Sequence, residues 1–372
     1  NYTRPLVDIF AIQDEIATDV ADALGASLLG NPDAIQGPAT QNLDAYETYL
    51  QALDEQASFS YGGLEAAEGL FKRALATDPD FKDARLGLAR NYILMNMTGL
   101  LDHDQTEQLL IPLLETVQSE DPDNPEARAY ELVFRTEWPE VFNALSPEEQ
   151  RSAMSELRGL LAVIPDEWLV RWRVSQLVEW WEDDDEAALE VLQAGLLVDP
   201  RSAFLYARIG DQLIDLGRLD EAQSALERAR ELDPAQPGVY TRLAALARAR
   251  NDLPGHLDWM RQAVEIDAQD HEMAAALAED FYQLQLTEEG DRWARRVSAL
   301  VPGSDFDRIL AVARAESRSD WTTVMELAAA MIEGQATQRE GIFPRAAGAY
   351  AHAPMQMGES ESAYDYLMSL QP

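Results

Sequence analysis

Apolar residues recur through most of this chain at intervals of three or four, the spacing that places side chains on one face of an α-helix. The clearest example lies between Ala203 and Pro234, where two apolar stripes flank a short polar turn. The first stripe consists of Tyr206, Ile209, Gly210 and Leu213, and the second of Ala222, Leu226 and Ala229. Small residues at Gly210 and Ala222 would let two helix backbones approach closely. The pattern therefore predicts a pair of packed helices.

The same pattern recurs along the chain, and each copy ends at a proline in an Asp-Pro or similar turn. These prolines are Pro79, Pro122, Pro165, Pro200 and Pro234, and the first two intervals between them are longer than the last two. We interpret the two longer intervals as standard repeats that carry projecting insertions near Met97–Gln108 and Trp138–Glu149. Weaker copies continue toward the C-terminus, so we expect eight or nine helix pairs.

The copy from Ala203 to Pro234 resembles the tetratricopeptide repeat at nearly every consensus position, and the period of about 34 residues agrees. The resemblance implies an all-α fold, a right-handed superhelical solenoid of about eight to nine helix pairs over residues 41–372. Residues 1–40 differ, because an amphipathic helix around Ile9–Val20 is followed by a linker, Gly30–Pro38. We interpret this segment as the end of an upstream domain.

This opening carries a second resemblance. Arg4–Ala17, read together with Asn42–Leu50 and Ala66–Asp80, is similar to bacterial proteins in which a TolB-like domain passes into tetratricopeptide repeats. Such regions occur in adenylate-cyclase-type proteins and in transmembrane winged-helix regulators. The sequence contains neither a cyclase nor a winged-helix segment. The resemblance therefore implies a module of a bacterial signalling protein, without the chemistry of those domains.

The charge narrows the range of partners. The chain carries 67 acidic and 29 basic side chains, a formal net charge of −38. Such a surface repels phosphate backbones and anionic membrane faces, so we expect no nucleic-acid partner. No apolar run reaches the length of a membrane span, so we expect no direct membrane insertion. The absence of cysteine leaves cytoplasm and periplasm open, and we favour the periplasmic side of a membrane-anchored protein.

Candidate chemistry is sparse. The four histidines are dispersed over separate repeats at His103, His256, His271 and His352, without the spacing of a helical metal site. We place His103 in an exposed insertion loop. The acidic stretch Asp121–Glu126 is interpreted as a repeat turn rather than a calcium loop. We interpret Glu182–Glu186 as a solvated turn between two helices, whose carboxylates favour the N-terminus of the second. We therefore expect no catalytic residues, no metal and no cofactor. The alternatives are a hydrolase with an active site built on the repeats, and a homo-oligomerisation module.

In tetratricopeptide proteins the first helix of each pair lines a concave groove, and the resemblance transfers its groove positions to this chain. The predicted partner-binding residues are Trp172, Gln176, Trp180, Phe204, Asp211, Asp215 and Tyr282. The Lys and Asn residues with which chaperone-binding relatives clamp a carboxylate are absent from these positions. An aromatic, acidic groove instead suits an apolar segment flanked by Arg or Lys. The competing interpretation places Trp172 and Trp180 in the packing core.

The sequence thus predicts a non-catalytic protein–protein interaction scaffold or sensor module. We expect its partner to be a protein or peptide with basic flanks, and a homodimer remains an alternative assembly.

Overall fold

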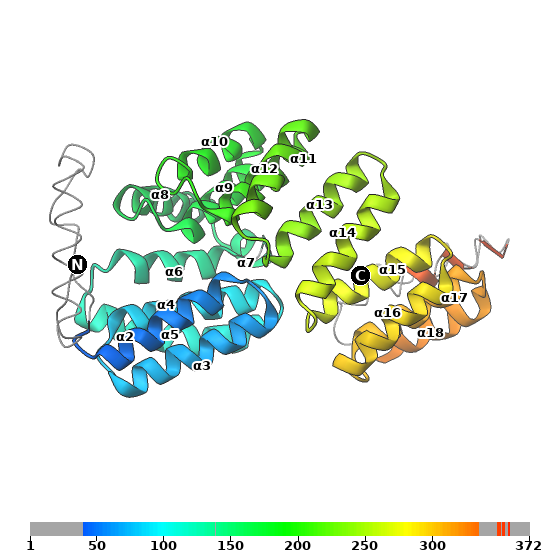
Figure 1. Cartoon of the computed structure of the whole chain (residues 1–372), viewed down its shortest axis with the longest axis horizontal. Helices are drawn as coiled ribbons and strands as arrows, with labels where there is room; N and C mark the ends of the chain where they lie inside the picture. Colours follow the sequence, from blue (N-terminus) through cyan, green and yellow to red (C-terminus); the bar gives the residue numbers. More distant parts are fainter. Residues whose placement is uncertain (1–39, 138, 335–347, 351, 354–355, 358–372) are drawn as a thin grey trace, which may run out of the picture. The chain divides into compact units, whose positions relative to one another are not determined.

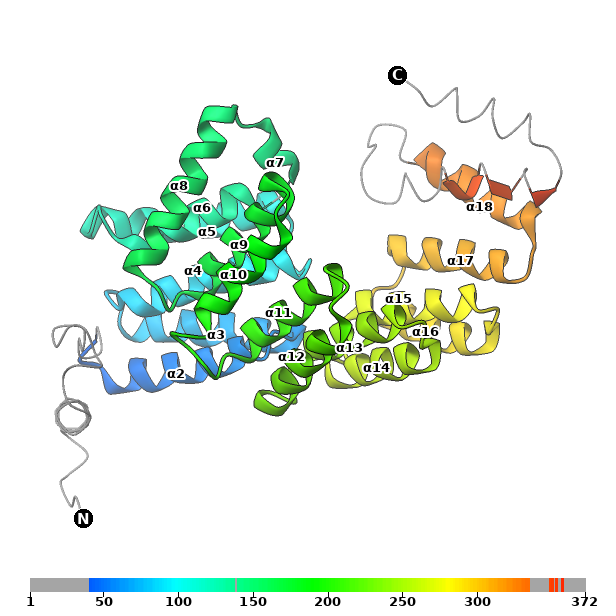
Figure 2. The same cartoon turned by 90° about the horizontal axis from the view of Figure 1, so that it is seen from above.

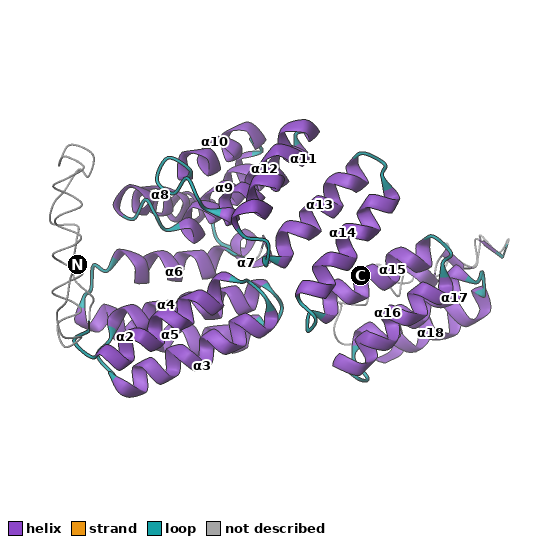
Figure 3. Cartoon of the chain, viewed as in Figure 1, coloured by secondary structure: helices purple, strands orange, loops and turns teal. Residues whose placement is uncertain are grey.

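The computed structural model describes residues 40–137, 139–334, 348–350, 352–353 and 356–357. The regular elements within these ranges are α-helices, with no β-strand among them (Figure 3). The all-α prediction is confirmed. Residues 1–39, which hold the predicted N-terminal amphipathic helix and its linker, lie outside the described residues. The chain divides into two compact units at Leu177 and Val178, and each is described by itself.

Unit 1 consists of helix pairs that follow one another along the chain (Figure 1). Its helices are α2 (Leu43–Ala57), α3 (Tyr61–Thr77), α4 (Lys82–Met97), α5 (His103–Glu120), α6 (Pro125–Thr136), α7 (Pro139–Ala144), α8 (Pro147–Val163) and the first part of α9 (Trp168–Glu182). The pairs are α2–α3, α4–α5 and α6–α8, with the short α7 inserted into the third. We call the first helix of each pair an A helix and the second a B helix.

Unit 2 continues the pairing more regularly (Figure 2). After the last turn of α9 come α10 (Asp185–Gly195), α11 (Ala203–Asp215), α12 (Leu219–Leu232), α13 (Pro237–Ala249), α14 (Leu253–Ile266), α15 (His271–Gln283), α16 (Thr287–Leu300), α17 (Asp305–Ser317) and α18 (Trp321–Gly334). The helices α11 to α18 form four pairs, and each pair packs on the next. The right-handed superhelix stays a prediction.

The turns between A and B helices repeat at an even spacing. One residue with a left-handed backbone occurs in each of five successive turns, at Asp183, Gly217, Asn251, Gln285 and Ser319. This conformation ends one helix and redirects the chain into the next. Polar side chains then cap many of the helices that follow. Asn42, Ser60, Asp102, Asn124, Ser146, Asp184, Ser202, Asp252 and Asp270 each accept a hydrogen bond from a first-turn amide.

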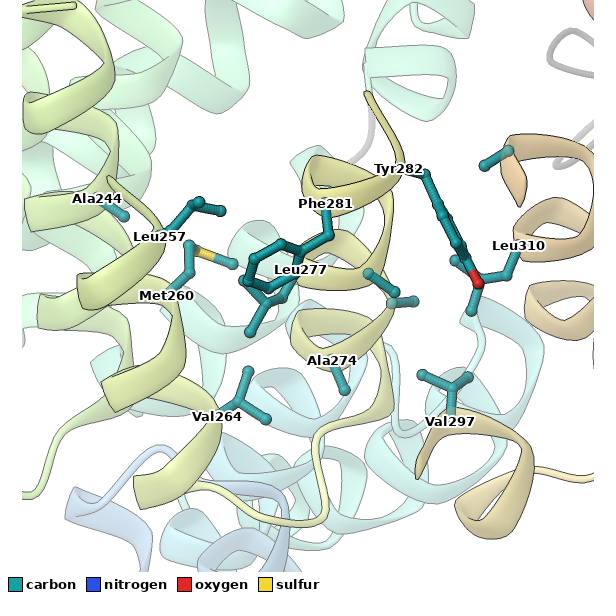
Figure 4. Packing of buried hydrophobic residues seen from close by; sticks show 13 residues of the cluster. Ala244, Leu257, Met260, Val264, Ala274, Leu277, Phe281, Tyr282, Val297 and Leu310 are labelled. Carbon is teal, nitrogen blue, oxygen red and sulfur yellow. The ribbon is translucent and has the colours of Figure 1, made fainter. Parts of the chain in front are cut away.

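The core lies between the helices of successive pairs (Figure 4). In unit 2, Leu277 and Phe281 of α15 meet Met260 of α14 in one buried cluster. Tyr282, on the same helix, points toward Leu310 of α17. The small residues predicted at helix crossings are confirmed as close contacts, because a Cβ at Gly210 would lie 2.5 Å from Leu226.

The two predicted insertions turn out differently. Met97–Gln108 is not a projecting loop, because α5 already begins at His103 and the additional length is helical. His103 is accordingly at a helix start, half-buried, with its ring stacked on Phe134 at 4.6 Å between centroids. The second insertion does contain additional structure, the short helix α7, whose Phe142 is fully buried. The acidic turns Asp121–Glu126 and Glu182–Glu186 both join helices, as predicted.

Candidate partner-binding face

Four carboxylates from three successive helices influence one another near the A helix α11. Glu179 is near the end of α9, Asp185 is in the first turn of α10, and Asp211 and Asp215 are one turn apart on α11. Residues 178–200 contain no Lys or Arg at all. We call these four carboxylates the acidic cluster.

Asp211 is held by arginines from two A helices. Its Oδ2 atom lies 3.0 Å from Nε of Arg242 on α13 and 3.5 Å from Nη1 of Arg208 on α11. Burial, and after it the neighbouring Arg242, lower the pKa of Arg208 to about 9, although Asp211 and Glu179 act in the opposite direction. The Asp211 carboxylate therefore compensates two confined guanidinium groups, and its role is to join α11 to α13.

Asp215 is in a different position. Within the part of the chain that the structure describes, no ion pair involves its carboxylate, which is on an exposed residue. Partial burial raises its pKa, and repulsion from Asp211 and Asp185 raises it further. The pKa of Glu179 is also raised, first by burial and then by Asp215, Asp185 and Asp211. The part of each shift that comes from neighbouring carboxylates reflects repulsion between negative charges, so a cation placed there would be stabilised.

Phe204 supplies apolar surface on the same helix. Its ring centroid lies 5.1 Å from Cζ of Arg208, a cation–π contact, and the side chain is half-buried. Phe204 and Asp215 thus place an aromatic ring and a carboxylate that is unpaired among the described residues on the same helix, α11. This combination fits an apolar group beside a positive charge.

The other predicted groove residues are placed differently. Trp172, in unit 1, is only 7% exposed, and Tyr282 is only 2% exposed, with its hydroxyl donating to Oδ1 of Asp291 at 2.9 Å. Both are therefore core residues in this structure, because the helix faces that carry them are covered by their neighbours. Gln176 accepts a hydrogen bond from Arg173 at 3.1 Å, and Trp180 is half-buried.

Of the predicted residues, Phe204, Asp211 and Asp215 all lie on α11, with Phe204 in its first turn and Asp215 at its last residue. Sequence reasoning did not identify the arginines that compensate Asp211. Their signal was present, because Arg208 lies one helical turn before Asp211 on α11, and Arg242 occupies the equivalent position one repeat later.

Among the described residues, no three or more His, Asp and Glu side chains are arranged so that they could hold a metal ion, and the acidic cluster is no exception. His256 is buried among hydrogen-bond partners rather than ligands. Among the same residues, no helix combines the length and apolar character needed to cross a membrane.

Comparisons with known proteins bear on the fold. The sequence model of the tetratricopeptide repeat family matches residues 203–246, and no curated protein matches the chain. Yeast Tom70 superposes with a TM-score of 0.51 at 15% identity, covering 86% of this chain and 66% of its own. The APC/C hetero-tetramer Cut9–Hcn1 gives a TM-score of 0.47 at 13% identity, over 96% of this chain and 71% of the other. PilF of Pseudomonas aeruginosa superposes with a TM-score of 0.40 at 16% identity, and the match covers 50% of this chain and 85% of PilF.

The likeness to Tom70 supports the fold, whereas TM-scores below 0.5 add no argument. The match to the family model covers α11, α12 and most of α13, which carry the predicted repeat and two members of the acidic cluster, Asp211 and Asp215. This chain therefore contains a tetratricopeptide repeat region, within an all-α fold of the helical solenoid type.

Proposed function

We propose that this chain is a non-catalytic protein–protein interaction scaffold, and that the α11 face of unit 2 binds a peptide or protein segment in which Arg or Lys flanks an apolar stretch. The observation that carries the proposal is Asp215, a carboxylate without an ion-pair partner among the described residues, whose pKa is raised by burial and by its acidic neighbours. An incoming guanidinium or ammonium group would relieve that repulsion. Phe204 would contact the apolar stretch.

The sequence resemblance of Arg4–Ala17 supports a wider role, that of a module in a bacterial signalling protein of the TolB-like type. That stretch lies outside the described residues. The net charge of −38 argues in the same direction as the acidic cluster, toward basic rather than acidic partners.

The test uses two synthetic peptides with the same central leucine and phenylalanine, one flanked by arginine and the other by glutamate. Fluorescence anisotropy with the full chain should show binding of the arginine peptide only, weakening as salt is added. Asp215→Asn should weaken this binding by about two- to fivefold, the usual effect of one partly exposed charge.

The matched control is Asp258→Asn on the B helix α14, where the carboxylate is 67% exposed and pairs with Arg261. This variant should bind as the wild-type protein does. Equal affinity of the wild-type protein and Asp215→Asn for the arginine peptide would rule out the α11 face as the binding site.

A further inference from the structure

A buried polar network joins the A helices of unit 1. The Arg90 guanidinium on α4 donates from Nε to Oε1 of Gln56 on α2 at 2.9 Å, and its Nη1 lies 3.5 Å from Oε2 of Glu167. The same Glu167 oxygen accepts a hydrogen bond from the hydroxyl of Tyr130 on α6 at 3.0 Å. Gln56, Tyr130 and Glu167 are nearly inaccessible, and the Arg90 side chain is 19% exposed.

This network connects parts of the chain that a solenoid keeps apart. In a repeat array each pair contacts only its neighbours. Here Glu167 stands 77 residues after Arg90, just before α9, with the α6–α8 pair between them. A second contact joins residues that are still further apart in the sequence. The ring of Phe59, in the turn between α2 and α3, contacts the ring of Trp168, with 5.4 Å between the two ring centroids. The A helices α2, α4 and α6 lie side by side (Figures 1 and 2).

Arg90 is the cation of this network. Burial lowers its pKa, but Tyr130 and Glu167 raise it by more, so the guanidinium stays charged. Carboxylates surround it, and the pKa of Glu126 on α6 is raised by burial and then by repulsion from Glu167 and Asp83. Without Arg90 these acidic groups would repel one another across the covered face.

We infer that Arg90 locks unit 1 in a closed form, in which its A helices and the start of α9 cover one another's inner faces and leave no groove for a partner. A ligand could reach this face only by displacing Glu167 from Arg90 and Tyr130. The inference concerns unit 1 alone and does not depend on whether the α11 face binds a basic segment.

Hydrogen exchange of the full chain tests the closure. Arg90→Met keeps an unbranched apolar stem and removes the guanidinium group with its charge. We expect amide exchange at residues 57–61 and 164–170 to accelerate about tenfold or more, while the B helices α3 and α5 keep their protection. The control is Arg128→Met, which removes a guanidinium that joins α6 to Glu156 of α8 in the same unit. It should leave exchange at those two segments unchanged. Unchanged exchange in Arg90→Met would overturn the inference.

A second measurement does not require Arg90→Met to fold. The chain has no cysteine, so Phe59→Cys combined with Trp168→Cys gives one defined pair of thiols. A short bis-maleimide should join them within one chain in nearly every molecule, with or without Arg90→Lys, which conserves the charge. Failure of the two thiols to cross-link in a folded chain would show that unit 1 is open, and the closed form would be excluded.

Discussion

Gly210 of α11 lies directly against Leu226 of α12. A Cβ atom built on Gly210 would lie 2.5 Å from both Cγ and Cδ2 of Leu226, which is fully buried. The two helices therefore approach as closely as their backbones permit, at the position that the repeat pattern reserves for a small residue.

This relationship predicts that Gly210→Ala destabilises the protein although alanine favours helices. We expect a loss of about 1–3 kcal/mol in the free energy of unfolding, because the fully buried Leu226 side chain would have to shift away from the added methyl group. The matched variant is Gly159→Ala in α8, where an added Cβ would meet no atom within 4 Å. It should raise stability by about 0.5–1 kcal/mol. Urea denaturation measures the free energy of unfolding of both variants. A change of the same sign in the two variants would contradict the close approach of α11 and α12 as the cause.

The evenly spaced series of left-handed turn residues makes a second prediction. Gln285 has φ = 60°, a conformation that costs a residue with a Cβ about 1 kcal/mol or more, whereas Gly217 adopts it freely at the equivalent turn. Gln285→Gly should therefore raise the denaturation midpoint. Asn251→Gly should change it less, since asparagine tolerates this region better. If the two variants gained equally, side-chain strain at Gln285 would not be the cause.

His256 occupies the position in α14 that corresponds to Ala222 in α12, one repeat earlier. Its Nδ1 lies 2.9 Å from the Ala244 carbonyl oxygen, and its Nε2 lies 2.8 Å from Oδ2 of Asp280 on α15. The imidazole thus bridges three successive helices. We expect His256→Ala to cost about 1–3 kcal/mol, because the carbonyl and the carboxylate lose a buried partner. A double-mutant cycle of His256→Ala and Asp280→Ala should show that the two losses in unfolding free energy are not additive. Additive losses would contradict a stabilising contact between His256 and Asp280.

Glu137, at the end of α6, predicts a pH dependence. Burial raises its pKa to about 7, although Arg173 acts in the opposite direction. This carboxyl binds its proton more tightly in the folded chain than in the unfolded chain. The free energy of unfolding therefore falls as the pH rises from about 4.5 through 7. Glu137→Gln should therefore be more stable than the wild-type protein at pH 8, by about 1–3 kcal/mol, and show a smaller difference at pH 5. Parallel stability profiles of the two proteins across this range would contradict the assignment.

The regular helix pairs could be predicted from the sequence, because the residues that define them lie close together along the chain. Gly210, Ala222 and the Asp-Pro turns define a repeat that can be recognised from spacing alone. The start of α5 was also readable, since Asp102 and Gln105 form a capping box, although the longer interval was interpreted as a loop. The closure of unit 1 was not readable, because the Arg90–Glu167 contact joins distant repeats. For the same reason consensus positions did not reveal that Tyr282 is covered by neighbouring helices, and they left both the groove and the core interpretation of Trp172 open.

The most direct test of the central claim, that partner binding occurs on the α11 face of unit 2, is an exchange footprint. Amide hydrogen exchange of the full chain would be compared with and without a saturating concentration of the arginine-flanked peptide. We predict slower exchange at residues 179–186 and 203–217, with no change in α2, α4 and α6. Protection confined to unit 1, or to the B helices α12 and α14, would contradict it.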